Sequence, residues 1–159
     1  MKPRVYVETS VISYLTARPS RDLNVAARQQ SSIELWESQD RYELVISDLV
    51  LSEASAGDAQ AAAARRAWLT NLFVLPIDAD AQAVADALVA KGAMPAAAYA
   101  DALHIGIAAS QRIEVIASWN FRHIASVWAR SRIEAALLDL GYGACHIATP
   151  DELIEGEMQ

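Results

Sequence analysis

The sequence predicts an α/β protein in which a mostly parallel five-stranded sheet lies between helices, as a three-layer α/β/α sandwich. Five short runs have the β-branched and aromatic composition of strands. Each run is separated from the next by helix-like sequence, and these connections are long enough to join parallel neighbours. The predicted strands cover residues 5–7, 42–46, 73–75, 113–117 and 145–148.

The segments between the strands carry signals for helices. Small polar residues stand where helices would begin, and we expect Thr9 or Ser10 to cap the first helix, which directly follows the first strand. Apolar residues then recur loosely at helical spacing, and the alanine-rich segment is a strong helix by propensity. Further helices are predicted at 22–38, 49–56, 59–72, 78–91, 97–111 and 128–140, with a terminal turn at 150–154.

The size and composition of the chain indicate one soluble globular domain. Its 159 residues suit a single ordinary domain, and 53% hydrophobic with 21% charged residues argues against disorder. Charges interrupt every apolar run well before the roughly 20 residues that a membrane span needs. The first residues lead into a strand without the apolar core of a secretory signal. We expect a single domain at 1–154 and a polar tail at 155–159.

Charge and cysteine content narrow the functional classes. A net charge of −7 argues against a protein that coats duplex nucleic acid with a basic surface. An acidic chain can still bind a phosphate through a divalent cation held by its carboxylates. Cys145 is the only cysteine, so the chain forms no internal disulfide and a cytoplasmic location is expected. We expect Cys145 to be a buried strand residue.

Four polar residues fall at or near predicted strand ends. Glu8 follows the first strand, Glu53 lies on the helix after the second, Asp101 opens the helix before the fourth, and Asn120 follows the fourth. Ligands of parallel sheets bind outside the carboxyl ends of the strands, so all four could meet at one edge. Clustered carboxylates repel one another unless a cation shares them, and oxygen ligands suit magnesium or manganese. The alternative is that they are solvated or capping acids, with Glu8 capping the first helix.

Four segments that contain these residues, 5–10, 47–53, 101–105 and 118–121, resemble the PIN domain, and most of all the toxin nucleases of type II toxin–antitoxin pairs. They occur in the family's order and span almost the whole chain. The resemblance implies a ribonuclease that cleaves RNA with Mg²⁺ or Mn²⁺. It also implies a cognate antitoxin, a homo-oligomer, expected to be a dimer, and no contact with membranes. The implied catalytic residues are Glu8, Glu53, Asp101 and Asn120, the first three as metal ligands.

Two positions depart from the family's usual pattern. Glu8 stands where aspartate is usual, which moves the carboxylate out by one methylene. Asn120 offers a neutral oxygen where aspartate is common, so a second metal would bind less firmly. The alternative function is therefore a catalytically weak or inactive PIN-like module that binds RNA or protein. A phosphoacceptor domain of the receiver type is a third possibility, but no lysine ends a late strand, and no glycine-rich phosphate loop is present.

Three residues near the acids are candidates for substrate contact. Ser10 and Ser118 could orient a metal-bound water or donate to a phosphate, although each could equally be a cap or turn residue. His104 lies on the same helical face as the third acid and could hold a water or a phosphate. A packing role is the commoner one for a histidine in such an apolar helix.

Basic residues flank the fourth predicted strand. Arg112 precedes it, and Arg122 and His123 follow it. These side chains could contact RNA phosphates, since phosphate binding by arginine is the usual electrostatic component of nucleic-acid recognition. A solvated rim is the simpler interpretation.

Overall fold

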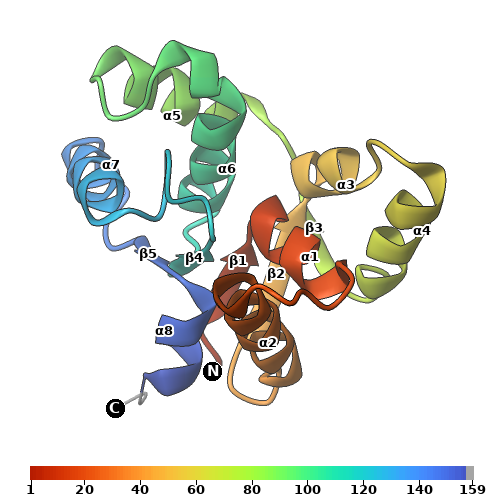
Figure 1. The fold of residues 1–159 in the computed structure, drawn as a ribbon. Coiled ribbons are helices and arrows are strands. Elements are labelled where there is room, and N and C mark those ends of the chain that lie inside the picture. Colours follow the sequence, from red (N-terminus) through yellow and green to blue (C-terminus); the bar gives the residue numbers. More distant parts are fainter. Residues whose placement is uncertain (157–159) are drawn as a thin grey trace.

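The five strands form one sheet in the order β3-β2-β1-β4-β5, and every neighbouring pair is parallel (Figure 1). The structure is a computed structural model that describes residues 1–156. Strand composition and helical connections therefore predicted the α/β fold class correctly. The strands are β1 (Arg4–Val7), β2 (Glu43–Ser47), β3 (Phe73–Leu75), β4 (Val115–Ala117) and β5 (His146–Ala148).

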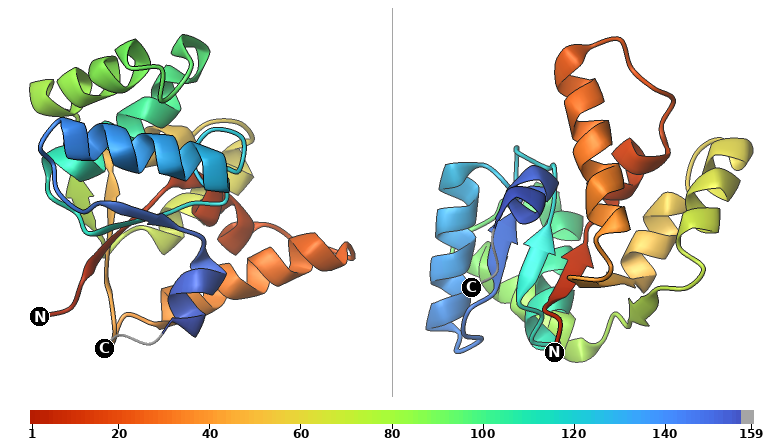
Figure 2. Two further views of the ribbon diagram at one scale, coloured as in Figure 1. Left: turned by 90° about the vertical axis from the view of Figure 1, so that its left-hand side faces the viewer. Right: turned by 90° about the horizontal axis from the view of Figure 1, so that it is seen from below.

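Helices cover both faces of this sheet (Figures 1 and 2). One group, α1 to α4, packs together on one face, while α5, α6 and α7 pack together on the other and α8 lies against α2. This division follows from right-handed crossovers, because the chain moves outward from β1 to β3 and then returns to β4 and β5. The helices are α1 (Thr9–Thr16), α2 (Leu23–Glu37), α3 (Asp48–Ala54), α4 (Ala59–Trp68), α5 (Ala79–Ala90), α6 (Tyr99–Ser110), α7 (Val127–Asp139) and α8 (Pro150–Glu155), with a short 3₁₀ helix η1 (Ala96–Ala98).

The central strand β1 is buried on both faces. Val5, Tyr6 and Val7 have no exposed surface, and the neighbouring β4 contributes Ile116 and Ala117 to the same core. Strands with helices on both sides of their sheet are apolar throughout rather than alternating. Any polar group at the end of β1 is therefore carried into the interior, where it must find partners.

Most helix starts are capped as their sequences predict. The side chains of Asp22, Ser47 and Asp78 accept hydrogen bonds from backbone N–H groups in the first turns of α2, α3 and α5. The first helix differs from the prediction, because Glu8 is its N-cap and Thr9 is already helical. The Glu8 carboxylate accepts from Ser10 N, so it takes the place of a hydroxyl cap.

The fourth strand is shorter than predicted, because the residues that precede it complete the C-terminal turn of α6. Arg112 adopts a positive φ of 55°, and Ile113 N donates to the carbonyl of Ala108 across the helix terminus. The same closure ends α5, where Gly92 has a φ of 74°. The segment 111–113 therefore terminates a helix and leaves only Val115–Ala117 for β4.

The C-terminal residues extend the predicted terminal turn into α8, which ends at Glu155. Cys145 is buried as expected but precedes β5 instead of belonging to it. The last residues of the predicted polar tail, 157–159, lie outside the described residues. None of the helices in residues 1–156 is both long and apolar enough to cross a lipid bilayer.

Candidate active site at the carboxyl edge of the sheet

The ends of β1 and β4 bring the first candidate residues together. Val7 pairs with Ala117 in the parallel ladder, and Glu8 N continues it by donating to the carbonyl of Ala117 at 3.1 Å. Two residues further along each segment, Ser10 Oγ accepts from Trp119 N at 2.8 Å. The start of α1 and the segment after β4 are therefore hydrogen-bonded to each other at the carboxyl edge.

Glu8 is a buried carboxylate, with 4% of its surface exposed. Its Oε2 caps α1 by accepting from Ser10 N at 2.6 Å. Burial raises the pKa of Glu8, and the charge of Asp101 adds to that increase, while His104 and the Ser10 hydrogen bonds oppose it. Capping therefore occurs, but it engages only Oε2, and Oε1 has no hydrogen bond to any residue within 1–156.

Glu53 lies on α3 and faces the start of α1. Its Oε1 accepts from Thr9 Oγ1 at 2.7 Å and lies 2.5 Å from His104 Nε2. Burial by itself would raise the pKa of Glu53, but the hydrogen bond and charge of His104, together with the Thr9 hydroxyl, outweigh it and lower the pKa. The second acid is thus held in its charged form.

His104 connects Glu53 to the core. It is 1% exposed, its Nδ1 lies 2.6 Å from Tyr6 Oη, and that oxygen lies 2.8 Å from Ser47 Oγ. Since a carboxylate only accepts, Nε2 donates to Glu53, and Nδ1 is hydrogen-bonded to the tyrosine hydroxyl. Burial raises the pKa of Tyr6, which keeps this phenol protonated. The expected contact of His104 with substrate is therefore replaced by internal bonds at both ring nitrogens.

Asp101, in the first turn of α6, is held from the segment after β4. Its Oδ2 lies 2.9 Å from His123 Nδ1. Asn120 Oδ1 accepts from His123 N at 3.1 Å, while Asn120 N donates to Ser118 Oγ at 3.0 Å. The amide oxygen of Asn120 is thus used in a turn that positions His123. Ser118 is fully buried, so it supports this turn and does not reach the surface.

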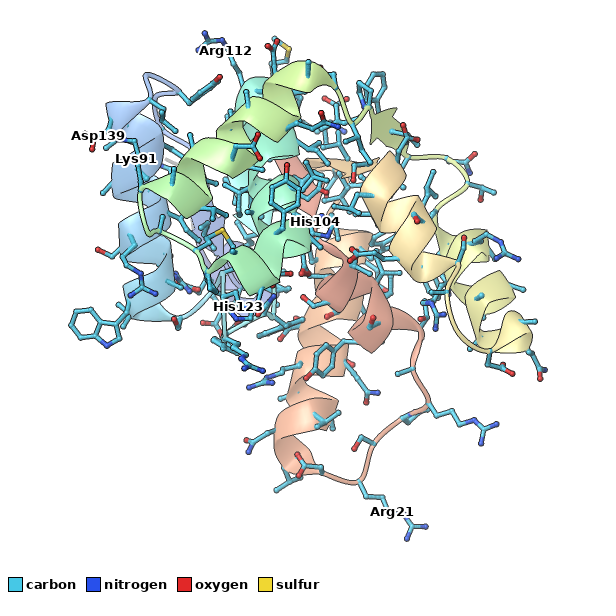
Figure 3. The ribbon with its side chains drawn as sticks, turned by 90° about the horizontal axis from the view of Figure 1, so that it is seen from above. Arg21, Lys91, His104, Arg112, His123 and Asp139 are labelled. Atoms are coloured by element: carbon cyan, nitrogen blue, oxygen red, sulfur yellow. The ribbon has the colours of Figure 1, made fainter. Side chains whose placement is uncertain are left out.

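The two predicted arginine contacts lie in different places. Arg112 is at the opposite edge, where its carbonyl accepts from the guanidinium of Arg4 at 2.9 Å (Figure 3). Since it precedes β4 in a parallel sheet, it lies at the amino end of the strands, away from the acids. Arg122 is exposed beside His123 at the carboxyl edge. The structure therefore keeps Arg122 near the candidate site and separates Arg112 from it.

The sequence predicted other roles for the residues that form hydrogen bonds with the acids. Thr9 is predicted as a helix cap, yet its hydroxyl bonds Glu53. His123 is predicted as a phosphate contact, yet it bonds Asp101. His123 lies three residues after Asn120, a spacing at which an asparagine side chain accepts from a later backbone N–H as it does at a helix cap. No sequence signal pairs Tyr6 with His104.

The three acids have the donor chemistry of a divalent-cation site. One oxygen of each, Glu8 Oε1, Glu53 Oε2 and Asp101 Oδ1, has no hydrogen bond within the described chain. Carboxylate oxygens are the ligands that magnesium and manganese prefer. No three histidine, cysteine, aspartate or glutamate side chains in residues 1–156 are placed as a formed metal centre. The residues thus fit such a cation by their donors, not by their present spacing.

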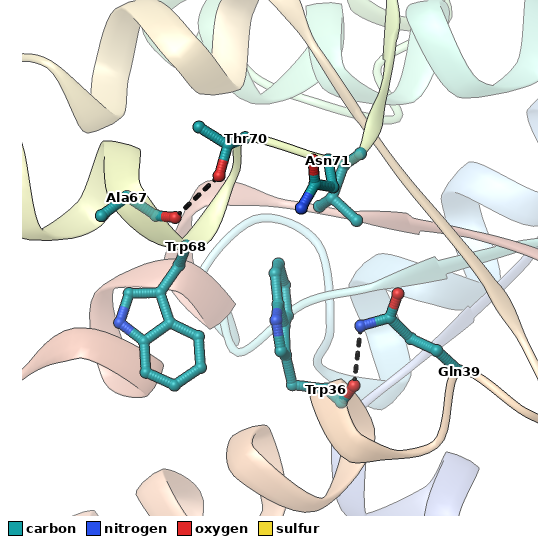
Figure 4. Close-up of a pocket in the computed structure, with 7 residues that line it drawn as sticks. Trp36, Gln39, Ala67, Trp68, Thr70 and Asn71 are labelled. Atoms are coloured by element: carbon teal, nitrogen blue, oxygen red, sulfur yellow. Dashed lines mark hydrogen bonds between the residues drawn. The ribbon is translucent and has the colours of Figure 1, made fainter.

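A surface hollow elsewhere on the molecule has no such chemistry. It measures about 440 Å³ and lies between the ends of α2 and α4, where the rings of Trp36 and Trp68 are 6.2 Å apart and nearly perpendicular (Figure 4). Both helices end there before the strands begin, so the hollow is at the amino edge. It has no titratable side chain in its lining, which is Trp36, Gln39, Ala67, Trp68, Thr70, Asn71 and Leu72.

A parallel α/β sheet with carboxylates gathered at its carboxyl edge defines a class of ligand-binding or catalytic domain. Residues 5–127 match the PIN domain, and the chain belongs to that family. No curated protein sequence is significantly similar to the chain. The predicted resemblance to the PIN domain is confirmed.

Two solved structures share the fold at low sequence identity. The Mycobacterium tuberculosis toxin VapC20, described as cleaving the sarcin–ricin loop, has a TM-score of 0.56 and 19% identity over 74% of this chain and 91% of its own. FitAB bound to an IR36 DNA fragment has a TM-score of 0.54 and 17% identity, covering 98% of this chain and 99% of that chain. At these identities, the likeness establishes the fold.

Proposed function

We propose that this protein is a metal-dependent endoribonuclease that hydrolyses RNA phosphodiester bonds with Mg²⁺ or Mn²⁺. One observation carries the proposal. Glu8, Glu53 and Asp101 lie around the carboxyl edge of a PIN-domain sheet, and each keeps an oxygen that the protein leaves unbonded. A buried carboxylate with a raised pKa beside a second carboxylate is costly to maintain for structure alone.

The similar structures support the choice of substrate and partner. One of them is a toxin described as cleaving the sarcin–ricin loop, and the other is FitAB on a DNA fragment. Together with the four family-like segments, they favour a toxin of a type II toxin–antitoxin pair, which acts on RNA and is held by a cognate antitoxin. A dimer and a cytoplasmic location belong to the same proposal, and the single buried thiol of Cys145 is compatible with a reducing compartment.

In this proposal the chain's own residues prepare the acids for a cation. The chemistry supplied by a divalent cation at such a site is polarisation of the phosphodiester and activation of water. Glu53 is kept charged by His104 and Thr9. His123 fixes the orientation of Asp101 through Oδ2 and leaves Oδ1 free. Glu8 acts as a ligand in its charged form, so cation binding opposes the increase in its pKa that burial causes.

Thermal unfolding with and without manganese tests the metal site. A cation that binds only the native protein adds about 2.7 kcal/mol at a hundredfold excess over its dissociation constant. We expect a higher melting temperature in manganese, reversal by EDTA, and manganese-dependent cleavage of a single-stranded RNA. A melting temperature that neither manganese nor EDTA changes, without cleavage in manganese, would contradict the proposal.

The second candidate function is a PIN-like module that binds RNA or protein with little or no cleavage. It is favoured by the commitment of Asn120 Oδ1 to a turn, since this oxygen already accepts from His123 N. Metal affinity separates the two candidates, since the module has no need of a cation. RNA binding without manganese-dependent stabilisation would favour the module.

A further inference from the structure

A guanidinium group enclosed by aromatic rings lies beside the candidate site. Arg28 projects from α2, and its Cζ is 4.9 Å from the ring centroid of Phe121, 5.7 Å from that of Trp119 and 5.9 Å from that of Tyr14. Tyr14 belongs to α1, and the other two rings flank Asn120 after β4. We call these three rings the aromatic platform. It joins α1 and α2 to the segment that positions the third acid.

Hydrogen bonds tie the platform rigidly to the acids. Trp119 N donates to Ser10 Oγ, and Ser10 N donates to Glu8 Oε2, so Trp119 and Glu8 are connected through one residue. On its other side, Trp119 Nε1 donates to Ser32 Oγ at 2.8 Å, and that hydroxyl donates to the carbonyl of Arg28 at 2.7 Å. Trp119 is buried, whereas Phe121 is 40% exposed. The platform thus has a fixed interior ring and one ring open to solvent.

The donors of Arg28 are largely free. Only Nη1 makes a hydrogen bond within the described chain, to Tyr14 Oη at 3.1 Å, and no carboxylate in residues 1–156 forms an ion pair with this guanidinium. Arginine carries five N–H donors in a planar fork. In a chain of net charge −7, a guanidinium without a carboxylate partner among the described residues attracts an anion to its place on the surface.

Arg41 shows what a purely structural arginine on an aromatic ring looks like in this protein. Its Cζ lies 5.2 Å from the ring centroid of Tyr42. Its Nη atoms donate to the carbonyls of Leu153, Ile154 and Gly156, so it fastens the C-terminal helix. Arg28 has the same aromatic contact without the carbonyl partners. The difference leaves most donors of Arg28 available for a ligand.

We infer that Arg28 and Phe121 form a subsite for single-stranded RNA next to the acids, in which Arg28 binds a backbone phosphate and Phe121 stacks a base. The inference rests on the proposed function and names where its substrate is held. A single strand offers an anionic phosphate beside an unstacked base, which matches a free guanidinium beside an exposed ring. An acidic peptide would satisfy the arginine but offers no matching planar base to the phenyl ring.

Binding in EDTA separates this subsite from catalysis. The dissociation constant of a short labelled single-stranded RNA is measured by fluorescence anisotropy at several salt concentrations. We expect Arg28→Gln to weaken binding about tenfold and to reduce the magnitude of the logarithmic salt slope by about 0.7, the value for one phosphate of a single strand. Phe121→Leu should weaken binding roughly five- to hundredfold without changing the slope, because it removes stacking and no charge. Arg28→Lys should keep the slope.

Arg41→Gln is the matched control, because it removes an arginine from an aromatic ring far from the acids. It should lower the melting temperature and leave the RNA dissociation constant unchanged. Melting curves of all variants establish that each one is folded. Parental affinity in folded Arg28→Gln and Phe121→Leu would overturn the inference and make Arg28 a structural cross-link like Arg41.

The remaining outcomes are equally decisive. No RNA binding by the parent in EDTA would overturn the subsite. Loss of polyglutamate binding in Arg28→Gln with RNA binding intact would also overturn it and identify a protein contact. Arg28-dependent RNA binding by a parent that shows no cleavage in manganese would support the subsite while the proposed ribonuclease activity fails.

Discussion

The two edges of the sheet treat ionisable side chains in opposite ways. At the carboxyl edge, Glu8 is 4% and His104 is 1% exposed, and both depend on internal hydrogen bonds. At the amino edge, Arg4 and Glu114 pair at 3.7 Å with side chains 35% and 53% exposed. Exposed pairs contribute little to stability, whereas buried polar groups must be compensated one by one. The carboxyl edge is therefore where the fold accepts an energetic cost, as expected of a functional site.

Helix polarity explains which charge lies at which edge. The N-termini of α1 and α3 open at the carboxyl edge, and Glu8 and Ser47 cap them. Asp101 lies in the first turn of α6, while at the other end of this helix the carbonyls of Gln111 and Arg112 accept from Arg4. Acids are stabilised at helix N-termini and cations at C-termini. Helix polarity therefore favours Glu8 and Asp101 at one edge and Arg4 at the other.

Neutralising one acid at each edge tests this contrast most strongly. Asp101→Asn removes a proposed metal ligand and one member of a repelling pair, so cleavage should fall by about a hundredfold or more while the fold stays intact or becomes firmer. Asp139→Asn, an exposed acid at the end of α7 near the amino edge, is the control and should cleave like the parent (Figure 3). Equal cleavage by both variants and the parent would make Asp101 structural.

Substitutions of Glu8 distinguish a role as metal ligand from a role as helix cap. Glu8→Asp should keep or raise manganese-dependent cleavage, because aspartate still caps a helix and has the length usual in the family. Glu8→Gln keeps the length but loses the charge, and cleavage should fall roughly tenfold or more. The assay compares initial rates on one single-stranded RNA. If all three proteins cut alike, Glu8 would be only a cap.

Two histidine substitutions, one at each edge of the sheet, form a matched pair for measuring stability. His104→Phe removes the ring partner of the buried Tyr6 hydroxyl and the main partner of the partly exposed Glu53, and each lost hydrogen bond costs about 1 kcal/mol. We expect a loss of about 2 kcal/mol in the free energy of unfolding measured with urea. His146→Phe removes an exposed contact to Glu134 at the amino edge and should change it by less than about 0.5 kcal/mol. Similar losses would remove the contrast between the edges.

Local sequence signals predicted the helices and strands. Contacts between residues far apart in the sequence depend on the order of the strands, which these signals could not predict. Strand composition and caps such as Asp22 act within a few residues, so they were recognisable. The bond between Tyr6 and His104 joins residues 98 apart, and it depends on which strand lies beside which helix. Arg112 illustrates a different limit, because nearness to a strand in sequence does not place a residue at the functional end. In a parallel sheet, residues directly before a strand lie at the amino edge and residues directly after it lie at the carboxyl edge.

The last prediction asks whether exposure or location decides the energetic value of an ion pair. Glu152 lies in α8, just after β5, and therefore at the carboxyl edge, yet its side chain is 48% exposed. It binds Arg130 through both oxygens, at 3.0 and 3.1 Å, and these hydrogen bonds, against the effect of burial and with help from Thr149, lower the pKa of Glu152 to about 2. Because half the side chain is solvated, the pair contributes only a few tenths to about 1 kcal/mol.

The pH dependence follows from the sign of that shift. A carboxyl group with a lowered pKa in the folded protein stabilises it above the ordinary pKa of 4.5, and this contribution is lost as the pH falls toward about 2. The difference in free energy of unfolding between the parent and Glu152→Gln should therefore be constant above pH 4.5 and shrink between pH 4.5 and about 2. Urea titrations of both proteins across this range measure it, and effects of other groups cancel in the difference. A difference of several kcal/mol at neutral pH would show that location at the carboxyl edge outweighs exposure.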